Sequence, residues 1–396
     1  ELFIKSRHFS HNLLDLGQSV TLIIFVESFC KEFLMKFIYF FIVIDILLTS
    51  ITYIYYRQNF AFAKTWSFFF VYLALAVNAV GSRLLPETAP LFILKASSWL
   101  SGLWIAFMYY SLMLALLHTL LWLGSKIFSF SLPNFKIACA GLLLVVSLVA
   151  WGTFRAFNPV VRTEEILTSK LPPNSSYKIV LVSDIHLGRI LGNDYAKDLV
   201  KKINAQNPDL VLMAGDILDE KISYVVEQDS LSQLAKLNAK LGVYAAYGNH
   251  DYLDKPLVWQ GMLEANNIKV LRDASIIVDG KLKISGLNDF SRNRSNVTLE
   301  KLASDNEYYY SILIDHQPRK IEPASAAGYD LYVAGHTHTG QLFPNRLITK
   351  KMYKLDYGRK EFDNMTAITS NGYGFWGPPV RTELAPELVV ITVKSL

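Results

Sequence analysis

The stretch Lys178-Ile-Val-Leu-Val-Ser-Asp-Ile-His186 decides the fold of the second half of this 396-residue chain. A short apolar run of this kind suits a strand that is buried on both faces. It ends in an aspartate and a histidine, and the same arrangement returns further along the chain. Strand-like runs also precede Ala214-Gly-Asp216, Tyr247-Gly-Asn-His-Asp251, Asp315-His316 and Gly335-His-Thr-His338.

Helical stretches at residues 194–205, 230–241 and 257–266 separate several of these strands. Strands that alternate with helices, followed by strands in close succession, predict an α/β domain with two packed sheets. Ligands of such domains collect at the carboxyl ends of the strands, so polar side chains far apart in sequence are expected to converge. Carboxylate and imidazole groups with one amide, and without thiolate, suit divalent Mn, Fe or Zn. So many ligands require two ions.

Each motif alone has a plainer explanation. Asp219, for example, suits either a helix cap or a hydrogen-bond acceptor near the site. Because the motifs follow one another at successive strand ends, a shared site is the stronger interpretation.

Upstream of residue 157 the composition changes. Residues 1–156 carry 11 Lys and Arg against 6 Asp and Glu, whereas the remainder carries 28 of each. Spanning a bilayer takes about 20 apolar residues, and four stretches qualify, at 37–56, 65–82, 97–123 and 137–154. We therefore predict a four-helix transmembrane domain over residues 35–156, preceded by an interfacial or poorly ordered segment at 1–34. A natural start at Met35 would make that segment incidental.

The rest of the chain is predicted as a linker at 157–176 and a soluble domain at 177–396. Four spans put both ends on one side of a cell membrane, where seven flanking basic residues against four opposite favour a cytoplasmic soluble domain. The balanced charge of this domain argues against a nucleic-acid partner. The only cysteines, Cys30 and Cys139, lie in the apolar half, which excludes a disulfide framework and a thiolate metal site.

From about Ser176 to Val393 the chain resembles the calcineurin-like metallophosphoesterase superfamily, and the residues of its motifs are more similar still to the membrane-anchored, YkuE-like branch. The resemblance rests on the order of the blocks above, and on Asp184-Ile-His-Leu-Gly188, Gly335-His-Thr-His-Thr-Gly-Gln341 and Gly377-Pro-Pro-Val-Arg381. It implies a four-layer α/β/β/α sandwich and two divalent ions, with Mn favoured. By the resemblance, one ion would be bound by Asp184, His186, Asp216 and His338, and the other by Asp216, Asn249, His316 and His336.

The resemblance also implies a mechanism, in which a hydroxide shared by the two ions is the nucleophile. His250 would be the general acid, and Asp251 would accept a hydrogen bond from its imidazole. Asp315, beside His316, is expected to face outward.

Together these features predict a membrane-bound, binuclear-metal phosphohydrolase. It would cleave a phosphoester or pyrophosphate bond of a phosphorylated small-molecule or, in particular, a lipid-linked substrate, whose binding residues the sequence does not identify. Two alternatives stay open: an enzyme of the UDP-2,3-diacylglucosamine pyrophosphatase type in lipid A synthesis, and a membrane sensor or binding module that keeps the metals without turnover. The segment 343–362 interleaves six basic residues with Tyr353 and Tyr357. It either rests on anionic headgroups or is a solvated loop.

Overall fold

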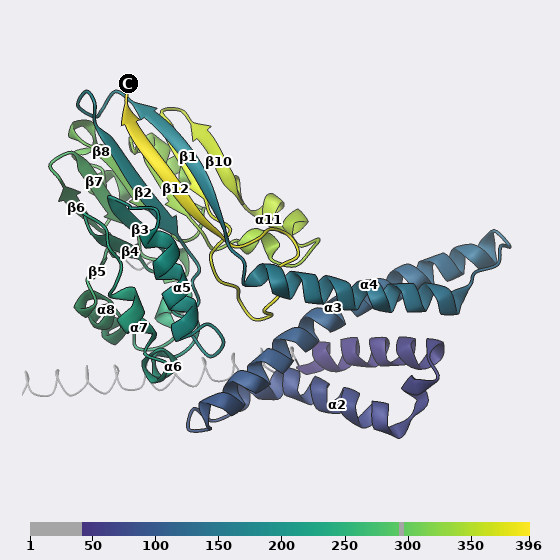
Figure 1. The fold of residues 1–396 in the computed structure, drawn as a ribbon. Coiled ribbons are helices and arrows are strands. Elements are labelled where there is room, and N and C mark those ends of the chain that lie inside the picture. The colour runs from purple at the N-terminus through teal and green to yellow at the C-terminus, as the bar shows by residue number, and fades with distance from the viewer. Residues whose placement is uncertain (1–41, 293–296) are drawn as a thin grey trace, which may run out of the picture.

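The computed structural model describes residues 42–292 and 297–396, so the predicted segment at 1–34 lies outside the described residues. The soluble half is built on two six-stranded sheets that pack face to face (Figure 1). The first sheet contains β1 (Val160–Thr168), β12 (Glu387–Ser395), β2 (Ser176–Val182), β3 (Leu210–Ala214), β4 (Val243–Ala246) and β5 (Ile268–Val270), in that order. The second contains β10 (Gly358–Phe362), β11 (Met365–Thr369), β9 (Leu331–Ala334), β8 (Tyr310–Ile314), β7 (Leu282–Gly286) and β6 (Ala274–Val278).

Strand β2 shows why the sandwich forms. Ile179 and Leu181 pack into the core between the two sheets, whereas Val180 and Val182 pack against helices on the other face. Because successive side chains of a strand point to opposite faces, a continuous apolar run is buried on both.

Helices cover the two outer faces of the sandwich. The first sheet is covered by α5 (Asn193–Asn204), α6 (Ile222–Glu227), α7 (Ser230–Leu234) and α8 (Pro256–Ala265). The second is covered by α9 (Leu299–Leu302) and α10 (Ile321–Ala326). The predicted four-layer α/β/β/α architecture is therefore confirmed.

The predicted linker at 157–176 needs correction, because it contains strand β1. This strand pairs in parallel with β12 along its whole length, from Val160 opposite Glu387 to Thr168 opposite Ser395. Its signal is weak in sequence because it is an edge strand with only Ile166 buried, and its partner lies at the other end of the chain. Only three residues separate β1 from the last membrane helix, so the two halves are joined without a free linker.

Three helices in the described residues are long and apolar enough to cross a membrane. They are α2 (Trp66–Gly81), extended to Leu84 by a 3-10 turn, α3 (Leu91–Ile127) and α4 (Asn134–Ala156). These coincide with the last three predicted spans. The first predicted span begins outside the described residues, and its described part is helical from residue 42 to residue 59.

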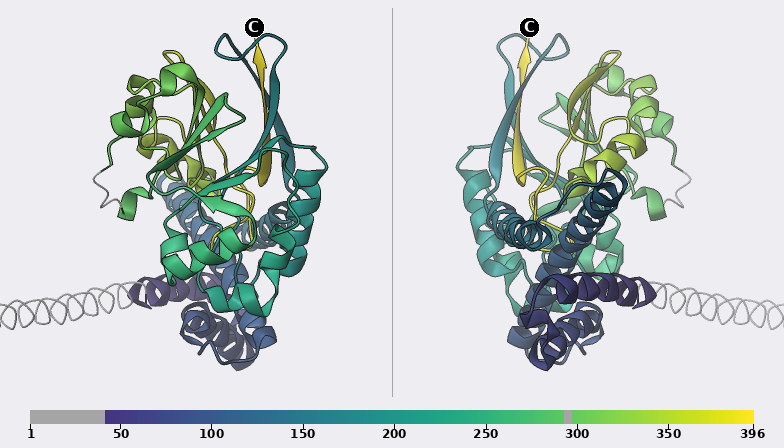
Figure 2. Two further views of the ribbon diagram at one scale, coloured as in Figure 1. Left: turned by 90° about the vertical axis from the view of Figure 1, so that its left-hand side faces the viewer. Right: turned by 90° about the vertical axis from the view of Figure 1, so that its right-hand side faces the viewer.

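Helix α3 is longer than its predicted span. Its 37 residues correspond to about 55 Å, well beyond a hydrocarbon core of ~30 Å. Its N-terminal part packs against the soluble domain at Gly102, where a Cβ atom would lie 2.4 Å from Pro379 Cδ. The membrane helices thus gather at one end of the sandwich (Figure 2).

Strand direction decides what lies at that end. β2 runs antiparallel to β12 and parallel to β3 and β4. The carboxyl ends of β2, β3 and β4 therefore point toward the membrane helices (Figures 1 and 2).

Candidate metal centre

The seven predicted ligands lie together at this end of the sandwich. Asp184 and His186 follow β2, Asp216 follows β3, Asn249 follows β4, His316 follows β8, and His336 and His338 follow β9. Five of the seven, Asp184, His186, Asp216, His336 and His338, have positive φ angles between 45° and 71°. Non-glycine residues in this region of backbone space are uncommon and gather at functional sites. The strained turns aim these side chains at one another.

The first group of possible ligands comprises Asp184, His186 and His338, whose ligand atoms lie within 4.8 Å of one another. The Nε2 atoms of His186 and His338 are 3.2 Å apart, and His338 Nε2 lies 3.4 Å from Asp184 Oδ1. Asp216 Oδ2 is 3.8 Å from His186 Nε2.

The second group comprises Asp216, His316 and His336. His316 Nε2 lies 3.2 Å from Asp216 Oδ2, 3.2 Å from Asn249 Oδ1 and 3.1 Å from His336 Nδ1. His316 Nδ1 is 2.8 Å from the carbonyl of Ala214. Because a carbonyl only accepts, Nδ1 carries the proton and Nε2 faces the cluster with its lone pair when the ring is neutral. One carboxylate oxygen of Asp216 is thus near both groups.

The buried carboxylates draw positive charge into the cluster. Burial alone would lower the pKa of His316, but the carboxylates of Asp216 and Asp184 outweigh burial and hold its pKa well above the usual value. Burial and the neighbouring His316 cation lower the pKa of His336 to about 3. Two adjacent imidazoles whose nitrogens are 3.1 Å apart are therefore driven in opposite directions. Buried carboxylates that face crowded ring nitrogens are the donor set that divalent metals take in proteins, so the residues fit such ions.

Gly248 makes room for the shared carboxylate. A Cβ atom at this position would lie 2.2 Å from Asp216 Oδ1 and 2.5 Å from the Asp216 nitrogen. The Gly in the Gly-Asn-His-Asp motif therefore lets β4 approach the turn after β3.

The structure corrects the predicted role of Asp251. Its fully buried carboxylate accepts hydrogen bonds from the backbone N–H groups of Ile217, Leu218 and Gly248 at 2.9–3.1 Å, and from the Trp259 indole at 3.1 Å. It therefore ties the turn after β3 to the turn after β4.

Asp219, and not Asp251 as predicted, is the aspartate whose oxygens lie beside the imidazole of His250. The Nδ1 atom of His250 donates to the Asp219 backbone carbonyl at 2.6 Å and lies 3.5 Å from its carboxylate. The same carboxylate lies 3.3 Å from His186 Nδ1. Asp219 does not cap helix α6, whose N-cap is Lys221, so the capping alternative is excluded.

Sequence reasoning assigned no role to Arg381. Its side chain is fully buried and donates to the backbone carbonyls of His338, Asn371, Gly372 and Gly374 at 2.5–3.3 Å. Burial lowers its pKa to about 10. In the sequence, the only indication of this residue was its place in the Gly-Pro-Pro-Val-Arg motif, one of the motifs that carry the family resemblance.

Asp315 also departs from expectation. It is buried rather than outward-facing, because the hydroxyl of Tyr332 on the neighbouring strand β9 donates to it at 2.6 Å.

A cleft opens over the cluster. Its wall is polar on the side of His186, Asp216, Asn249, His250 and His336, and partly apolar where Leu342, Trp376 and Pro378 line it. The ring of Trp376 stands edge-on to His250, with 6.1 Å between the centroids.

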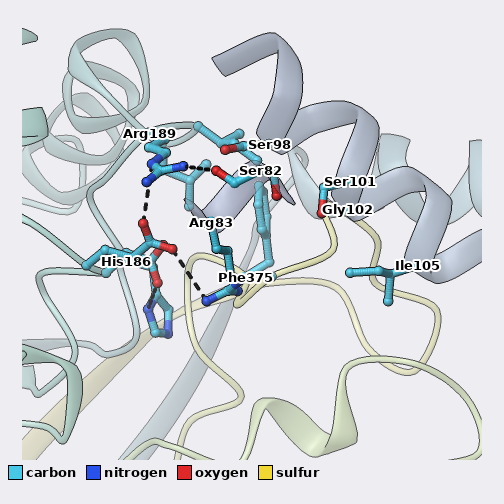
Figure 3. A pocket seen from close by; sticks show the side chains of 14 residues that line it. Ser82, Arg83, Ser98, Ser101, Gly102, Ile105, His186, Arg189 and Phe375 are labelled. Atoms are coloured by element: carbon cyan, nitrogen blue, oxygen red, sulfur yellow. Dashed lines mark hydrogen bonds and ion pairs between the residues drawn. The ribbon is translucent and has the colours of Figure 1, made fainter. Parts of the chain in front are cut away.

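A second, smaller pocket lies between His186 and the membrane helices (Figure 3). There Arg189 donates to the backbone carbonyl of Ser82 at 2.6 Å, and both Arg189 and Arg83 lie within 3.5 Å of Glu220. The turn between α2 and α3 is thus fixed directly beside the candidate metal centre.

Residues 177–340 match the calcineurin-like phosphoesterase family. The chain is 31% identical to an uncharacterized metallophosphoesterase of Aquifex aeolicus over 64% of this chain and 99% of that protein. It is 30% identical to the uncharacterized metallophosphoesterase YkuE of Bacillus subtilis, over 64% and 94% of the two chains. A bovine transmembrane protein with metallophosphoesterase domain is 29% identical over 66% of this chain and 62% of its own length.

Among solved structures, a 5′-nucleotidase precursor from Thermus thermophilus aligns over 55% of this chain and 54% of its own, at 14% identity and a TM-score of 0.36.

Proposed function

The chain belongs to the calcineurin-like metallophosphoesterase family, and from this premise we propose that it hydrolyses a phosphoester or pyrophosphate bond of a lipid-linked substrate. The observation that carries the proposal is the convergence of seven side chains into two groups around Asp216. Asp184, His186, Asp216 and His338 would hold one divalent cation, and Asp216, Asn249, His316 and His336 the other, with Mn²⁺ the preferred metal. When bound, such a pair lowers the pKa of a coordinated water and stabilises both the attacking and the leaving oxygen of an in-line displacement.

His250 is the proposed general acid. Its Nδ1 proton is engaged by the Asp219 carbonyl, so Nε2 is the ring nitrogen that remains for the cleft that His250 lines. An imidazole that carries a proton at Nε2 can protonate a leaving oxygen. The Asp219 carboxylate lies 3.5 Å from Nδ1, on the side of the ring away from the cleft, so together with the Asp219 carbonyl it holds the imidazole in place for this step.

The position of the cleft supports a lipid-linked substrate. Asn345, which lines it, accepts a hydrogen bond from Tyr109 of α3 at 2.8 Å. Leu342 and Val380 are buried against Ala106 of the same helix. A substrate that is anchored in the bilayer therefore has a short path to the proposed metal ligands.

We also propose that the soluble domain faces the cytoplasm. The basic residues that flank the spans support this orientation, although Arg83 and Arg155 also serve packing: Arg83 pairs with Glu220, and Arg155 donates to the carbonyls of Thr382 and Glu383. With Cys30 and Cys139 replaced by serine, a cysteine introduced at the exposed Leu257 should react with a membrane-impermeant maleimide only after cells are permeabilised. Labelling in intact cells would contradict the proposed orientation.

Purified full-length protein in lipid nanodiscs tests the activity. With Mn²⁺ it should hydrolyse an aryl phosphodiester, and His250→Ala should abolish most of this turnover. Mass spectrometry of a treated lipid extract, with UDP-2,3-diacylglucosamine as a separate substrate, should then reveal a dephosphorylated or cleaved lipid. A protein that binds Mn²⁺ with no turnover of any of these would be a binding module, and the enzymatic proposal would be wrong.

A further inference from the structure

Helix α11 (Arg346–Met352) presents its apolar side chains to the outside of the protein. Two of its polar residues, Arg346 and Thr349, face the protein: Arg346 Nε lies 3.4 Å from Asp356 Oδ2, and Thr349 Oγ1 donates to the same oxygen at 3.0 Å. Its apolar residues face outward, with Leu347 65%, Ile348 57% and Met352 56% exposed. A surface helix of a water-soluble domain normally presents its apolar stripe to the core.

The exposed side chains continue beyond the helix. Phe343, just before α11, is 57% exposed, and Trp376, at the mouth of the cleft, is 51% exposed. We call Phe343, Leu347, Ile348, Met352 and Trp376 the apolar rim. An apolar group of this size beside a cleft indicates an interaction surface.

The N-terminal end of α11 is anchored to the membrane helices. Tyr109 of α3 donates to Asn345, the N-cap residue of α11. The backbone N–H of Phe343 donates to Thr382 Oγ1 at 2.8 Å, and the Thr382 hydroxyl also contacts that of Tyr110. Figure 1 shows α11 beside the end of α4 that meets the sheets. The apolar rim is therefore held at a defined height along α3 and α4.

That height corresponds to a bilayer surface. Tyr109 lies 18 residues before Ile127, the last residue of α3, which is about 27 Å along the helix axis. On α4, Gly152 packs against Val380 and lies 18 residues after Asn134, the first residue of the helix. Both distances match a hydrocarbon core of ~30 Å. If the far ends of α3 and α4 lie at the far surface, the anchor of α11 lies at the near one.

The basic residues on α11 and just after it suit anionic headgroups, but fewer of them are free of ion pairs than the sequence suggested. Arg346, Lys354 and Arg359 are paired with Asp356, Glu322 and Glu361. Lys350 and Lys351 are exposed, and neither has an ion-pair partner within the described part of the chain. Two free lysines beside outward-facing apolar residues are typical of a helix that lies in the membrane interface.

We propose that the apolar rim inserts into the headgroup layer of the same bilayer that α3 and α4 span, with Lys350 and Lys351 on anionic lipid. The cleft then opens at headgroup height, between Leu342, Asn345 and Trp376. Delivery of a lipid phosphate to the candidate metal centre rests on the proposed function, whereas the insertion itself does not.

Nitroxide accessibility tests the insertion without reference to activity. Cys30 and Cys139 are replaced by serine in the full chain, and a spin label is attached at Leu347→Cys or Ile348→Cys in nanodiscs that contain anionic lipid. Leu144→Cys on α4 serves as the lipid-exposed reference. Leu257→Cys on α8, 74% exposed in the soluble domain, is the matched water-exposed control.

Collisions with a water-soluble nickel chelate should be about tenfold rarer at positions 347 and 348 than at 257, and collisions with oxygen should approach those at 144. Nickel accessibility equal to that of position 257 at both sites would overturn the proposal, and would be expected if the apolar rim instead bound a protein. Should one labelled variant fail to fold, a label at Met352→Cys replaces it. The double change Leu347→Glu and Ile348→Glu should expose a label at 352 to the chelate, whereas Leu257→Glu should not, and an unchanged label at 352 in the double variant would also refute insertion.

Discussion

Asp219 and Asp251 both lie near His250, but their replacement by alanine is predicted to have different effects: Asp251→Ala should lower stability, and Asp219→Ala should lower activity. Asp251→Ala removes the acceptor of three backbone N–H groups and one indole N–H, all of them buried. A buried donor left without a partner costs about 1–3 kcal/mol. Even the lower value gives a loss of about 4 kcal/mol in the free energy of unfolding.

For a domain of this size a loss of about 4 kcal/mol lowers the melting temperature by roughly 8–16 °C. Asp219→Ala leaves no backbone N–H group without its acceptor, because in the described residues no backbone N–H donates to the Asp219 carboxylate, which lies near the side chains of His186 and His250. Its melting temperature should fall by no more than about 3 °C, whereas kcat should fall about tenfold, as is usual when a partner of a catalytic or ligating histidine is lost.

Thermal unfolding of both variants in nanodiscs, with aryl phosphodiester turnover measured on the same preparations, separates the two roles. Hydrogen exchange gives a local check, because the amides of Ile217, Leu218 and Gly248 should exchange faster in Asp251→Ala only. An Asp251→Ala protein as stable as the wild type, with a selective loss of kcat, would refute this reasoning and restore Asp251 as the partner of His250.

Three further predictions follow from the candidate metal centre. Removal of metal with a chelator should lower the melting temperature, and Mn²⁺ at a hundredfold excess over its Kd should restore about 2.7 kcal/mol of the free energy of unfolding. The Asp216→Asn variant should lose most of this response to Mn²⁺. An undiminished response would show that the two cation positions do not share Asp216. Gly248→Ala should reduce turnover more than tenfold, because the new Cβ would lie 2.2 Å from Asp216 Oδ1 and would displace that carboxylate. Gly261→Ala is the control: nothing lies within 4 Å of its new Cβ, so this change should stabilise helix α8 by about 0.5–1 kcal/mol. Equal activity in the two variants would contradict the steric argument. Arg381→Met should lower the free energy of unfolding by on the order of 3 kcal/mol in chemical denaturation, because four carbonyls lose their donor. A decrease below about 1 kcal/mol would show that water replaces the guanidinium.

Much of this molecule could be predicted from local patterns. The apolar runs of β2, β3, β8 and β9 are short and continuous, and each is followed by the polar residues that the structure brings together. The membrane helices α2, α3 and α4 were visible because each contains enough consecutive apolar residues to cross a bilayer. The sequence pattern does not indicate strand β1, because this strand is exposed and charged and the strand that it pairs with, β12, comes more than two hundred residues later.

The sequence by itself determined which elements form and which residue types stand at their ends, because hydrophobic periodicity and strand-end position are properties of neighbouring residues. Only the tertiary structure decided that Asp219, and not Asp251, meets the imidazole of His250. It also decided that Asp216 lies near both ligand groups and that α11 turns its apolar side outward beside the cleft. These outcomes depend on how two sheets and three membrane helices pack against one another, and a distance between side chains on different elements is not encoded in either element alone.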